Sequence, residues 1–412
     1  MSQIKVAVTG FGLISALGRG AEENAAALYD GKSGIIGRPQ WAENKMRSQV
    51  AGNVDIEPLR KDFDRKESRF LCDAALLAAV AMKDAIEHAG LSQEEVEAPR
   101  TGIVMGTGGA SVPDAVALGD RMRARGGSKV GAYFVPRIMG SSITANLGNM
   151  FHIHGHSYSM TSACATSAHT IMHGLDLIRT GRQDRVFAGG AEDINVFCVA
   201  SFDGMNALSS AYNDQPQRAS RPLDRGRDGF VYSGGAAVLV LENLEVARSR
   251  GATILAILEG AGASCDGHDM VVPNQTGAEA AIGLSLEDAN ISTEQIQYIN
   301  LHGTSTPVGD VIEVQAIQNV FGAKLPAFSS TKSMTGHGLG AAGGQEAIFC
   351  ILMMQGGFLA PNINLEDPEP IVNDQPIVRE PQQAELGWTL SNSFGFGGTN
   401  CSLVFSHPDC SL

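Results

Sequence analysis

The sequence predicts an α/β fold in which short buried strands alternate with amphipathic helices. Seven short apolar runs have the composition of buried strands, and helical patterns fill the intervals between them. The chain is 43% hydrophobic and 18% charged, which excludes a disordered protein. Such alternation is typical of parallel sheets covered by helices on both faces. The strands are expected at residues 4–8, 102–105, 185–188, 236–241, 254–258, 296–301 and 401–405.

Five longer segments carry apolar residues at helical spacing. The glycines after two of the strands, at residues 9–12 and 106–109, are interpreted as turns. Ser15 stands where a dinucleotide fingerprint has its third glycine, and the second segment lacks the ending of a phosphate-binding loop, so a nucleotide site is disfavoured. The helices are expected at residues 67–88, 165–180, 277–289, 311–321 and 343–355.

The length of 412 residues exceeds one ordinary domain, and a faint internal repeat accounts for it. Residues 164–181 and 338–357 each show a small-residue turn, an apolar helix and a final glycine. The two segments lie nearly half a chain apart. The sequence therefore predicts two related α/β halves, residues 1–250 and 251–412.

The net charge of −14 disfavours nucleic acid and anionic membranes as partners. Seven cysteines, an odd number without a CxxC pair, follow no signal peptide, and this indicates a reducing cytoplasm. The longest apolar run, residues 74–82, is far shorter than the roughly 20 residues that span a bilayer. Insertion into a membrane is not expected.

Three histidines alternate at His152, His154 and His156, and on an extended strand they would share one face. Structural zinc usually requires four ligands, and no cysteine pair or acidic residue lies nearby. A solvated cluster on an edge strand is therefore favoured over a metal site, and no metal is expected.

Cys164 is the strongest candidate nucleophile. It lies among small residues directly before a predicted helix, where the helix dipole and free amides favour a thiolate. The alternative is a buried, inert cysteine. Two further features favour a catalytic role for Cys164. His302 and His337 lie in Gly/Thr-rich turns, and residues 392–400 form a glycine loop whose amides could bind an oxyanion.

Four sequence blocks together resemble the β-ketoacyl-acyl-carrier-protein synthases of the thiolase superfamily. They are Ser-Ala-Cys-Ala-Thr-Ser at 162–167, His-Gly-Thr-Ser-Thr-Pro-Val-Gly-Asp at 302–310, Lys-Ser-Met-Thr-Gly-His at 332–337 and Asn-Ser-Phe-Gly-Phe-Gly-Gly-Thr-Asn at 392–400. Residues 46–54 and 163–169 are most similar to the synthase I branch. The resemblance implies a thiolase-like fold of two αβαβα halves in five layers, and a homodimer.

The implied reaction condenses acyl-carrier protein with malonyl-carrier protein and releases CO₂. By resemblance, Cys164 takes the acyl chain, while His302 and His337 donate hydrogen bonds to the malonyl thioester oxygen. Lys332 and Glu313 would give electrostatic support. No cofactor is implied, because phosphopantetheine arrives on the carrier protein.

The resemblance also implies an oxyanion hole and a substrate channel. The amides of Cys164 and Phe396 would form the hole, and Phe396 would gate the site. Thr304 and Thr306 would contact the pantetheine arm. The remaining substrate-binding residues would be Phe202, Met205, Phe230, Gly395 and Gly397.

Carrier protein is acidic, so local basic residues are candidates for its docking site. Residues 121–137 hold five basic residues and no acidic one. An ordinary solvated face is the alternative, but charge complementarity favours docking. A second basic segment, residues 60–69, holds five basic and three acidic residues. By resemblance, Lys66 and Arg69 of this segment are docking residues, and the first segment would add Arg121, Arg123, Arg125 and Lys129, with Arg137 beside them.

Other functions remain as alternatives. A ketosynthase of a polyketide or aryl-polyene pathway would carry the same blocks. A non-catalytic partner of the chain-length-factor type is disfavoured, because such partners typically lack the nucleophile. A thiolase is disfavoured because the glycine loop has no second catalytic cysteine.

Overall fold

The computed structural model describes the chain except residues 1–2, 110, 323 and 412, and it has two five-stranded groups of the same order. The first group runs β6-β5-β7-β8-β1, and the second runs β11-β10-β14-β15-β9. A short pairing of β1 with β9 joins the groups into one sheet. The strands are β1 (Val6–Ser15), β5 (Thr101–Gly106), β6 (Ser157–Ser159), β7 (Arg185–Glu192), β8 (Gly235–Asn243), β9 (Ala256–Cys265), β10 (Tyr298–Asn300), β11 (Ala327–Ser329), β14 (Trp388–Gly395) and β15 (Thr399–Ser406).

Strand directions are mixed, so the expectation of parallel sheets is only partly correct. In each group the outer three strands are parallel. The other neighbours run antiparallel. In the second group the reason is local: only residues 396–398 separate β14 from β15, and so short a turn must send the chain back beside itself.

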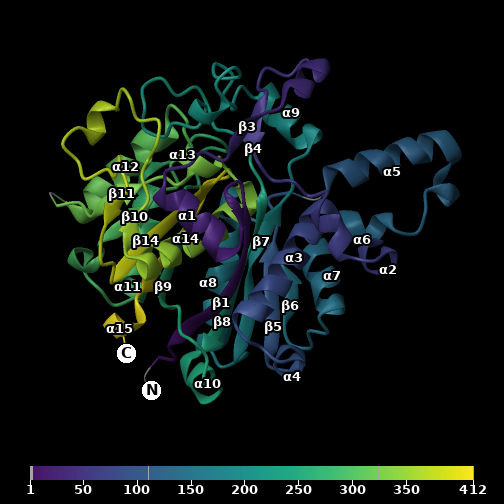
Figure 1. Cartoon of the computed structure of the whole chain (residues 1–412), viewed down its shortest axis with the longest axis horizontal. Helices are drawn as coiled ribbons and strands as arrows, with labels where there is room; N and C mark the ends of the chain where they lie inside the picture. The colour runs from purple at the N-terminus through teal and green to yellow at the C-terminus, as the bar shows by residue number, and fades with distance from the viewer. Residues whose placement is uncertain (1–2, 110, 323, 412) are drawn as a thin grey trace.

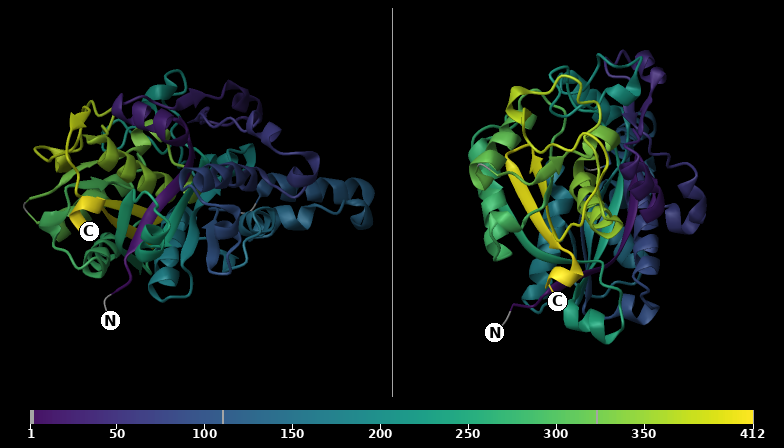
Figure 2. Two further views of the ribbon diagram at one scale, coloured as in Figure 1. Left: turned by 60° about the horizontal axis from the view of Figure 1, so that its bottom comes forward. Right: turned by 60° about the vertical axis from the view of Figure 1, so that its left-hand side comes forward.

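Two helices lie between the strand groups, and others cover their outer faces (Figure 1, Figure 2). The central pair is α8 (Thr166–Arg179) and α14 (Ala342–Gly356), and each contacts strands of both groups. Outside lie α3 (Asp73–His88) and α7 (Ser142–Met150) on one face, and α11 (Gln275–Asp288) and α12 (Gly309–Phe321) on the other. This arrangement has the five expected layers.

Gly10 and Gly12 do not form the expected turn, because β1 continues through them to Ser15. Their role is to let α3 approach the strand: a Cβ on Gly12 would lie 1.8 Å from the Ala81 carbonyl oxygen, and one on Gly10 would lie 2.6 Å from the Ala89 nitrogen. The second half repeats this feature. Cβ atoms on Gly260 and Gly262 of β9 would meet Ala289 and Ala281 of α11 at 2.5 and 2.2 Å.

The helix starts of the two halves also share one geometry. Ala163 and Leu339 both have left-handed backbones, with φ of 49° and 45°. Each of these residues begins a single 3₁₀ turn, Ala163–Ala165 or Leu339–Ala341, which leads directly into α8 or α14. The segments that echo each other in the sequence are thus the same structural unit. The division of the chain at residue 250 stays a prediction.

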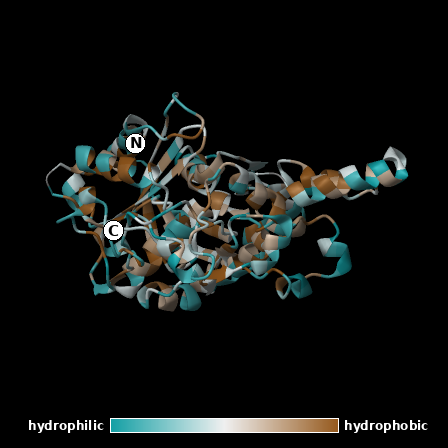
Figure 3. Ribbon diagram, turned by 90° about the horizontal axis from the view of Figure 1, so that it is seen from above, coloured by the Kyte–Doolittle hydropathy of each residue, from teal (hydrophilic) through white to brown (hydrophobic). Residues whose placement is uncertain are grey.

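Helix α5 (Val112–Arg125) was not predicted from the sequence, and none of its residues is buried. It extends away from the body of the molecule (Figure 2, left), and Figure 3 shows apolar and polar residues mixed along it. The shorter elements are β2 (Gly18–Arg19), β3 (Ile35–Gly37), β4 (Val50–Gly52), β12 (Phe358–Leu359), β13 (Gln382–Gln383), α1 (Gly20–Tyr29), α2 (Arg65–Ser68), α4 (Gln93–Glu97), α6 (Phe134–Ile138), α9 (Val196–Gly204), α10 (Leu244–Ser249), α13 (Lys332–Thr335) and α15 (Pro408–Ser411).

The three alternating histidines do not lie on a strand, contrary to expectation. They precede β6, and His152 has a left-handed φ of 53°, which breaks the extended alternation. His152 and His154 are exposed. Among the described residues, no group of three His, Cys, Asp or Glu side chains could hold a metal ion, and no helix is long and apolar enough to cross a membrane.

Candidate active site

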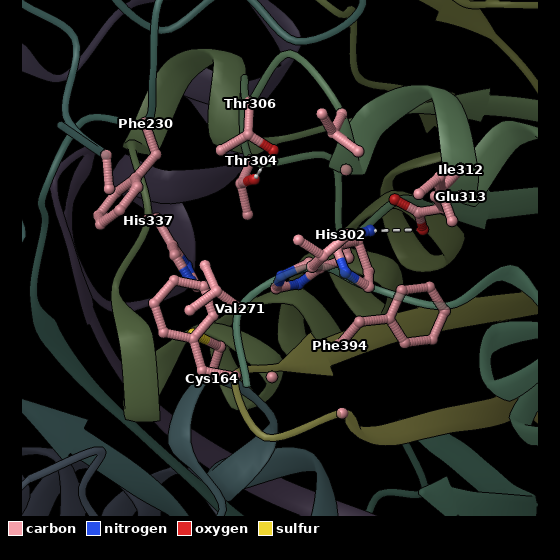
Figure 4. Close-up of a pocket in the computed structure, with 18 of the residues that line it drawn as sticks. Cys164, Phe230, Val271, His302, Thr304, Thr306, Ile312, Glu313, His337 and Phe394 are labelled. Atoms are coloured by element: carbon pink, nitrogen blue, oxygen red, sulfur yellow. Dashed lines mark hydrogen bonds between the residues drawn. The ribbon is translucent and has the colours of Figure 1, made fainter. Parts of the chain in front are cut away.

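A cavity of about 360 Å³ brings together the three strongest candidates from the sequence, Cys164, His302 and His337 (Figure 4). Both halves of the molecule line it. Cys164 comes from the start of the first central helix, while the two histidines follow β10 and α13 of the second half. The glycine-rich turn after β14 closes one side.

Cys164 lines this cavity and is 9% exposed. Burial raises the pKa of its thiol to about 11, although the Phe396 amide and the charge of Lys332 act to lower it. The position before a helix, which was expected to favour the thiolate, is outweighed by the desolvation of the buried sulfur. At neutral pH the Cys164 side chain is therefore held as a thiol.

The two imidazoles are neutral hydrogen-bonding groups. Burial first, and then the charge of Lys332, hold the pKa values of His302 and His337 well below their usual range. The rings meet edge to face, and Phe230 packs edge-on against His337 with ring centroids 5.5 Å apart. Within the described chain, Nδ1 of His302 and both ring nitrogens of His337 lack hydrogen-bond partners. They are thus free to bind a substrate oxygen.

Glu313 on α12 holds the turn that carries His302. Its carboxylate accepts hydrogen bonds from the backbone nitrogens of His302 and Gly303, at 2.8 and 2.7 Å, and from the Asn392 amide at 3.1 Å. Burial raises the pKa of Glu313 to about 7. The residue lines the cavity, and its contacts make it a support for His302.

Lys332 forms its salt bridge away from Glu313, whose carboxyl group it affects through its charge. It is 1% exposed, and its ammonium donates to Glu346 on α14. Lys332 does not line the cavity, so it acts on the site through its charge. Sequence reasoning missed Glu346, whose signal was a single carboxylate in the apolar helix at 343–355; burial raises its pKa to about 7.

Phe396 lies in the turn between β14 and β15, and its backbone amide donates toward the Cys164 sulfur. This places one of the two expected oxyanion-hole amides beside the nucleophile. Gly395 and Phe396 line the cavity, but Gly397 does not; its nitrogen donates to the Met270 carbonyl at 2.8 Å. Gly397 was expected to contact the substrate, but in the structure it instead connects the turn to the loop that carries Met270.

The expected chain-binding residues also line the cavity. Phe202 packs against Phe230, with centroids 5.2 Å apart, and against Phe396 at 6.1 Å. Met205 lines the same space, as do Thr304 and Thr306, whose hydroxyls lie 3.1 Å apart. The cavity therefore combines an apolar wall with hydroxyl groups beside His302.

Sequence reasoning missed the loop at residues 266–274, which also lines the cavity. Asp266 ties this loop to the glycine turn: its nitrogen donates to the Gly398 carbonyl, and its carboxylate accepts from Asn400 at 2.7 Å. Met270 is 73% exposed at the rim. The loop carries no motif, so only the fold reveals it.

The two basic segments lie side by side, because Arg137 donates to the Arg69 carbonyl and Tyr133 packs edge-on against Phe70. Residues 121–137 contain no acidic residue, but carboxylates from residues outside this range lie beside two of its arginines. Arg123 pairs with Asp120, and Arg137 pairs with Asp114. Among the described residues, Lys66, Arg125 and Lys129 have no carboxylate within salt-bridge distance.

The chain is similar in sequence to a known family of proteins. Residues 3–247 match the family model of the β-ketoacyl synthase N-terminal domain, and residues 255–366 match that of the C-terminal domain. The chain is 50% identical over 403 residues to 3-oxoacyl-[acyl-carrier-protein] synthase 1 of Haemophilus influenzae, covering 97% of this chain and 98% of that one.

Solved structures agree. A β-ketoacyl synthase from Burkholderia phymatum STM815 is 34% identical, with a TM-score of 0.92 over 98% of this chain and 99% of that one. A type II polyketide ketosynthase, AntDE, in complex with its acyl-carrier protein AntF is 26% identical, with a TM-score of 0.85 and the same coverage. The thiol and the two imidazoles that share this cavity, in a duplicated thiolase-like fold, thus lie in a chain that belongs to the β-ketoacyl synthase family.

Proposed function

We propose that this protein catalyses the decarboxylating condensation of acyl-carrier protein with malonyl-carrier protein, the elongation step of fatty acid synthesis. The products are 3-oxoacyl-carrier protein, CO₂ and free carrier protein. One observation carries the proposal: a buried thiol shares a cavity with two neutral imidazoles, and Nδ1 of His302 and both ring nitrogens of His337 have no partner among the described residues. The 50% identity to a synthase 1 over nearly the full length favours the same reaction.

The first step transfers the acyl chain to Cys164. The sulfur attacks the acyl thioester, the new Cys164–acyl bond forms, and the bond to the carrier's sulfur breaks. The Cys164 proton leaves with the carrier thiol. The amides of Cys164 and Phe396 would stabilise the tetrahedral oxyanion, which develops only in the transition state.

The second step forms the new carbon–carbon bond. The bond to the malonyl carboxylate breaks, CO₂ leaves, and its electron pair creates an enolate whose oxygen is held by His302 and His337. A neutral imidazole donates one hydrogen bond, so the low pKa values leave each ring ready to donate. The enolate carbon then attacks the acyl group on Cys164, and the released sulfur takes a proton from water.

Every atom in these steps comes from the two thioesters, the protein and water. The scheme therefore requires no bound cofactor; phosphopantetheine enters on the carrier protein, and Thr304 and Thr306 would contact it at the cavity. Phe202, Met205 and Phe230 would contact the acyl chain.

The carrier protein would dock where the two basic segments meet. Lys66, Arg125 and Lys129 offer charge that the described chain does not neutralise, while α5 presents Arg121 and Arg123 beside them. The carrier complex of AntDE supports such a partner. We place the reaction in the cytoplasm, in keeping with seven free cysteines.

The working form would be a homodimer. In the described sheet β6 is an end strand with one neighbour, and the adjoining α5–α6 region exposes Val135 at 70%, Met122 at 53% and Tyr133 at 47%. A second copy would cover the strand edge and Val135, while the arginines of α5 stay exposed to the carrier protein. Val135→Glu should convert a dimer to monomers in light scattering; a monomeric wild type would contradict this.

The function is tested with ¹⁴C-carboxyl malonyl-carrier protein and an acyl-carrier protein. Wild type should release ¹⁴CO₂ and form an acyl adduct that mass spectrometry maps to Cys164. Cys164→Ser should lose the adduct and condensation, while Cys265→Ser, an exposed cysteine, should retain both. An adduct on another residue, or condensation by Cys164→Ser, would overturn the proposal.

A further inference from the structure

The second half of the fold contains a counterpart of the oxyanion hole, and the chain fills it with its own carboxylate. Strand pairing sets the equivalence. Glu192 ends β7 opposite the first residue of β8, and Gly395 ends β14 opposite the first residue of β15. At the helix starts, the residue after left-handed Ala163 is Cys164, and the residue after left-handed Leu339 is Gly340. Glu192 of the first half thus occupies the position that Gly395 has in the second half. Gly340 of the second half occupies the position that Cys164 has in the first half.

The contacts of Glu192 show what fills the counterpart. The side chain is 3% exposed, and Oε2 accepts from the backbone nitrogens of Gly108 at 2.7 Å and Gly340 at 3.0 Å. Oε1 accepts from the Thr107 hydroxyl at 3.1 Å. The amide equivalent to that of Cys164 is therefore occupied by a carboxylate of the chain itself, where the true site would receive a substrate oxygen.

No side chain fits at the counterpart of the nucleophile. A Cβ on Gly340 would lie 2.2 Å from the Gly108 nitrogen and 2.9 Å from Oε2 of Glu192, and a Cβ on Gly108 would lie 2.7 Å from the same oxygen. The loop after β5 and the turn before α14 are held together by the carboxylate between them.

The turn that Glu192 holds is part of the catalytic cavity. Leu339, the residue before Gly340, lines the cavity and packs in one apolar cluster with Cys164 and Phe230. His337 is two residues before Leu339, and its ring nitrogens have no partner within the described chain. Its backbone is fixed on one side by Val231 and Ser233. Glu192 is the polar anchor on the other side, through Gly340.

We propose that Glu192 is a positioning residue for His337 and Leu339, acting as an acceptor that bridges the two halves behind the cavity. This inference rests on the proposed function, because its readout is the decarboxylation step. The carboxylate is not required to carry charge in this role. Glutamine could accept from both amides through its oxygen and donate to Thr107 through its nitrogen.

The test separates the two half-reactions in wild type, Glu192→Gln and Glu192→Asp. Aspartate keeps the carboxyl group but withdraws it by one methylene, so ¹⁴CO₂ release per folded protein should fall roughly five- to a hundredfold, the range for losing two buried hydrogen bonds. The acylation rate of Cys164 should fall much less. Glu192→Gln should restore CO₂ release to within about threefold of wild type, within the scatter of such effects.

Glu242→Gln is the matched control, since Glu242 is also a fully buried carboxylate on a strand but pairs with Arg185 and Arg250 away from the cavity. It should lower thermal stability without changing the ratio of CO₂ release to acylation. Equal losses of both half-reactions in Glu192→Asp, or a Glu192→Gln variant as impaired as Glu192→Asp, would overturn the inference. A wild type that neither acylates Cys164 nor releases CO₂ would instead refute the proposed function.

Discussion

The imidazole rings of His302 and His337 meet edge to face, with centroids 5.2 Å apart and planes at 87°. Two donors so arranged can hold one oxygen from two directions. Replacing either histidine with alanine should lower ¹⁴CO₂ release roughly 10²–10³-fold, as the loss of one oxyanion donor does. Acylation of Cys164, followed by mass spectrometry, should persist. Loss of acylation to the same degree would contradict the division of roles.

The pH dependence of decarboxylation follows from the same pair. Burial and Lys332 hold both pKa values well below 6.5, so both rings should stay neutral near neutral pH. The rate of decarboxylation should therefore not change with pH in that range and should fall only in more acidic solution. Lys332→Met removes one cause of the low pKa values, so the acid limb of the profile should move to higher pH. Lys324→Met, at an exposed position, should leave the limb in place. An unmoved limb in Lys332→Met would contradict the effect.

Glu313 should give the protein a stability that declines with pH. Its pKa is about 7 in the folded protein and near 4.5 when unfolded, so the folded state binds the proton more tightly. The stabilisation is full below pH 4.5 and is lost as the pH rises through 7. Glu313→Gln does not titrate, so the advantage of wild type over it should shrink by on the order of 3 kcal/mol across this range. Urea unfolding at several pH values measures this, with exposed Glu245→Gln as the control; a constant difference would refute it.

Two adjacent glycines in the turn after β14 should differ in their tolerance of alanine. Gly397 and Gly398 have φ of 84° and 72°, but a Cβ on Gly397 meets nothing within 4 Å, while one on Gly398 lies 2.6 Å from the Asp266 Cβ. Gly397→Ala should therefore cost about 1–2 kcal/mol from its backbone alone. Gly398→Ala should cost more and also slow acylation, because it displaces the loop at 266–274. Equal effects in denaturant unfolding and acylation kinetics would contradict this assignment.

Charge reversal on α5 should weaken only reactions with carrier protein. Arg123→Glu with Arg125→Glu should raise the KM for acyl-carrier protein severalfold, and more so at low salt, because docking is electrostatic. Small thioester substrates should be turned over as before. The control is Arg248→Glu, an exposed arginine on α10. An unchanged KM would place docking elsewhere.

The sequence was sufficient to predict which residues would meet in one cavity and the structural repeat that holds them. Cys164, His302 and His337 lie in distinctive local blocks, and the structure brings them into one cavity. The roles of these residues stay predictions until the half-reactions are measured. The alternation of strands and helices could also be predicted, since burial imposes it on every segment.

What depends on distant packing could not be predicted. Gly10 and Gly12 resemble a turn until α3 is seen against them. Glu346 is one acid in an apolar helix, and only the fold brings Lys332 to it. The thiolate expected at Cys164 follows from local position, but its pKa is set by the residues that bury it. These are all contacts between segments far apart in the chain.

The position of β1 has a consequence for synthesis of the protein. Its partners are β8, β9 and two-residue β2, so its main pairing must wait for Gly235 to leave the ribosome, some 220 residues after Ser15. At about 5–20 residues per second, the strand stays without its sheet for roughly 10 to 45 s. The first apolar strand of the nascent chain is therefore a natural substrate for chaperones, and fragments that end before residue 235 should aggregate.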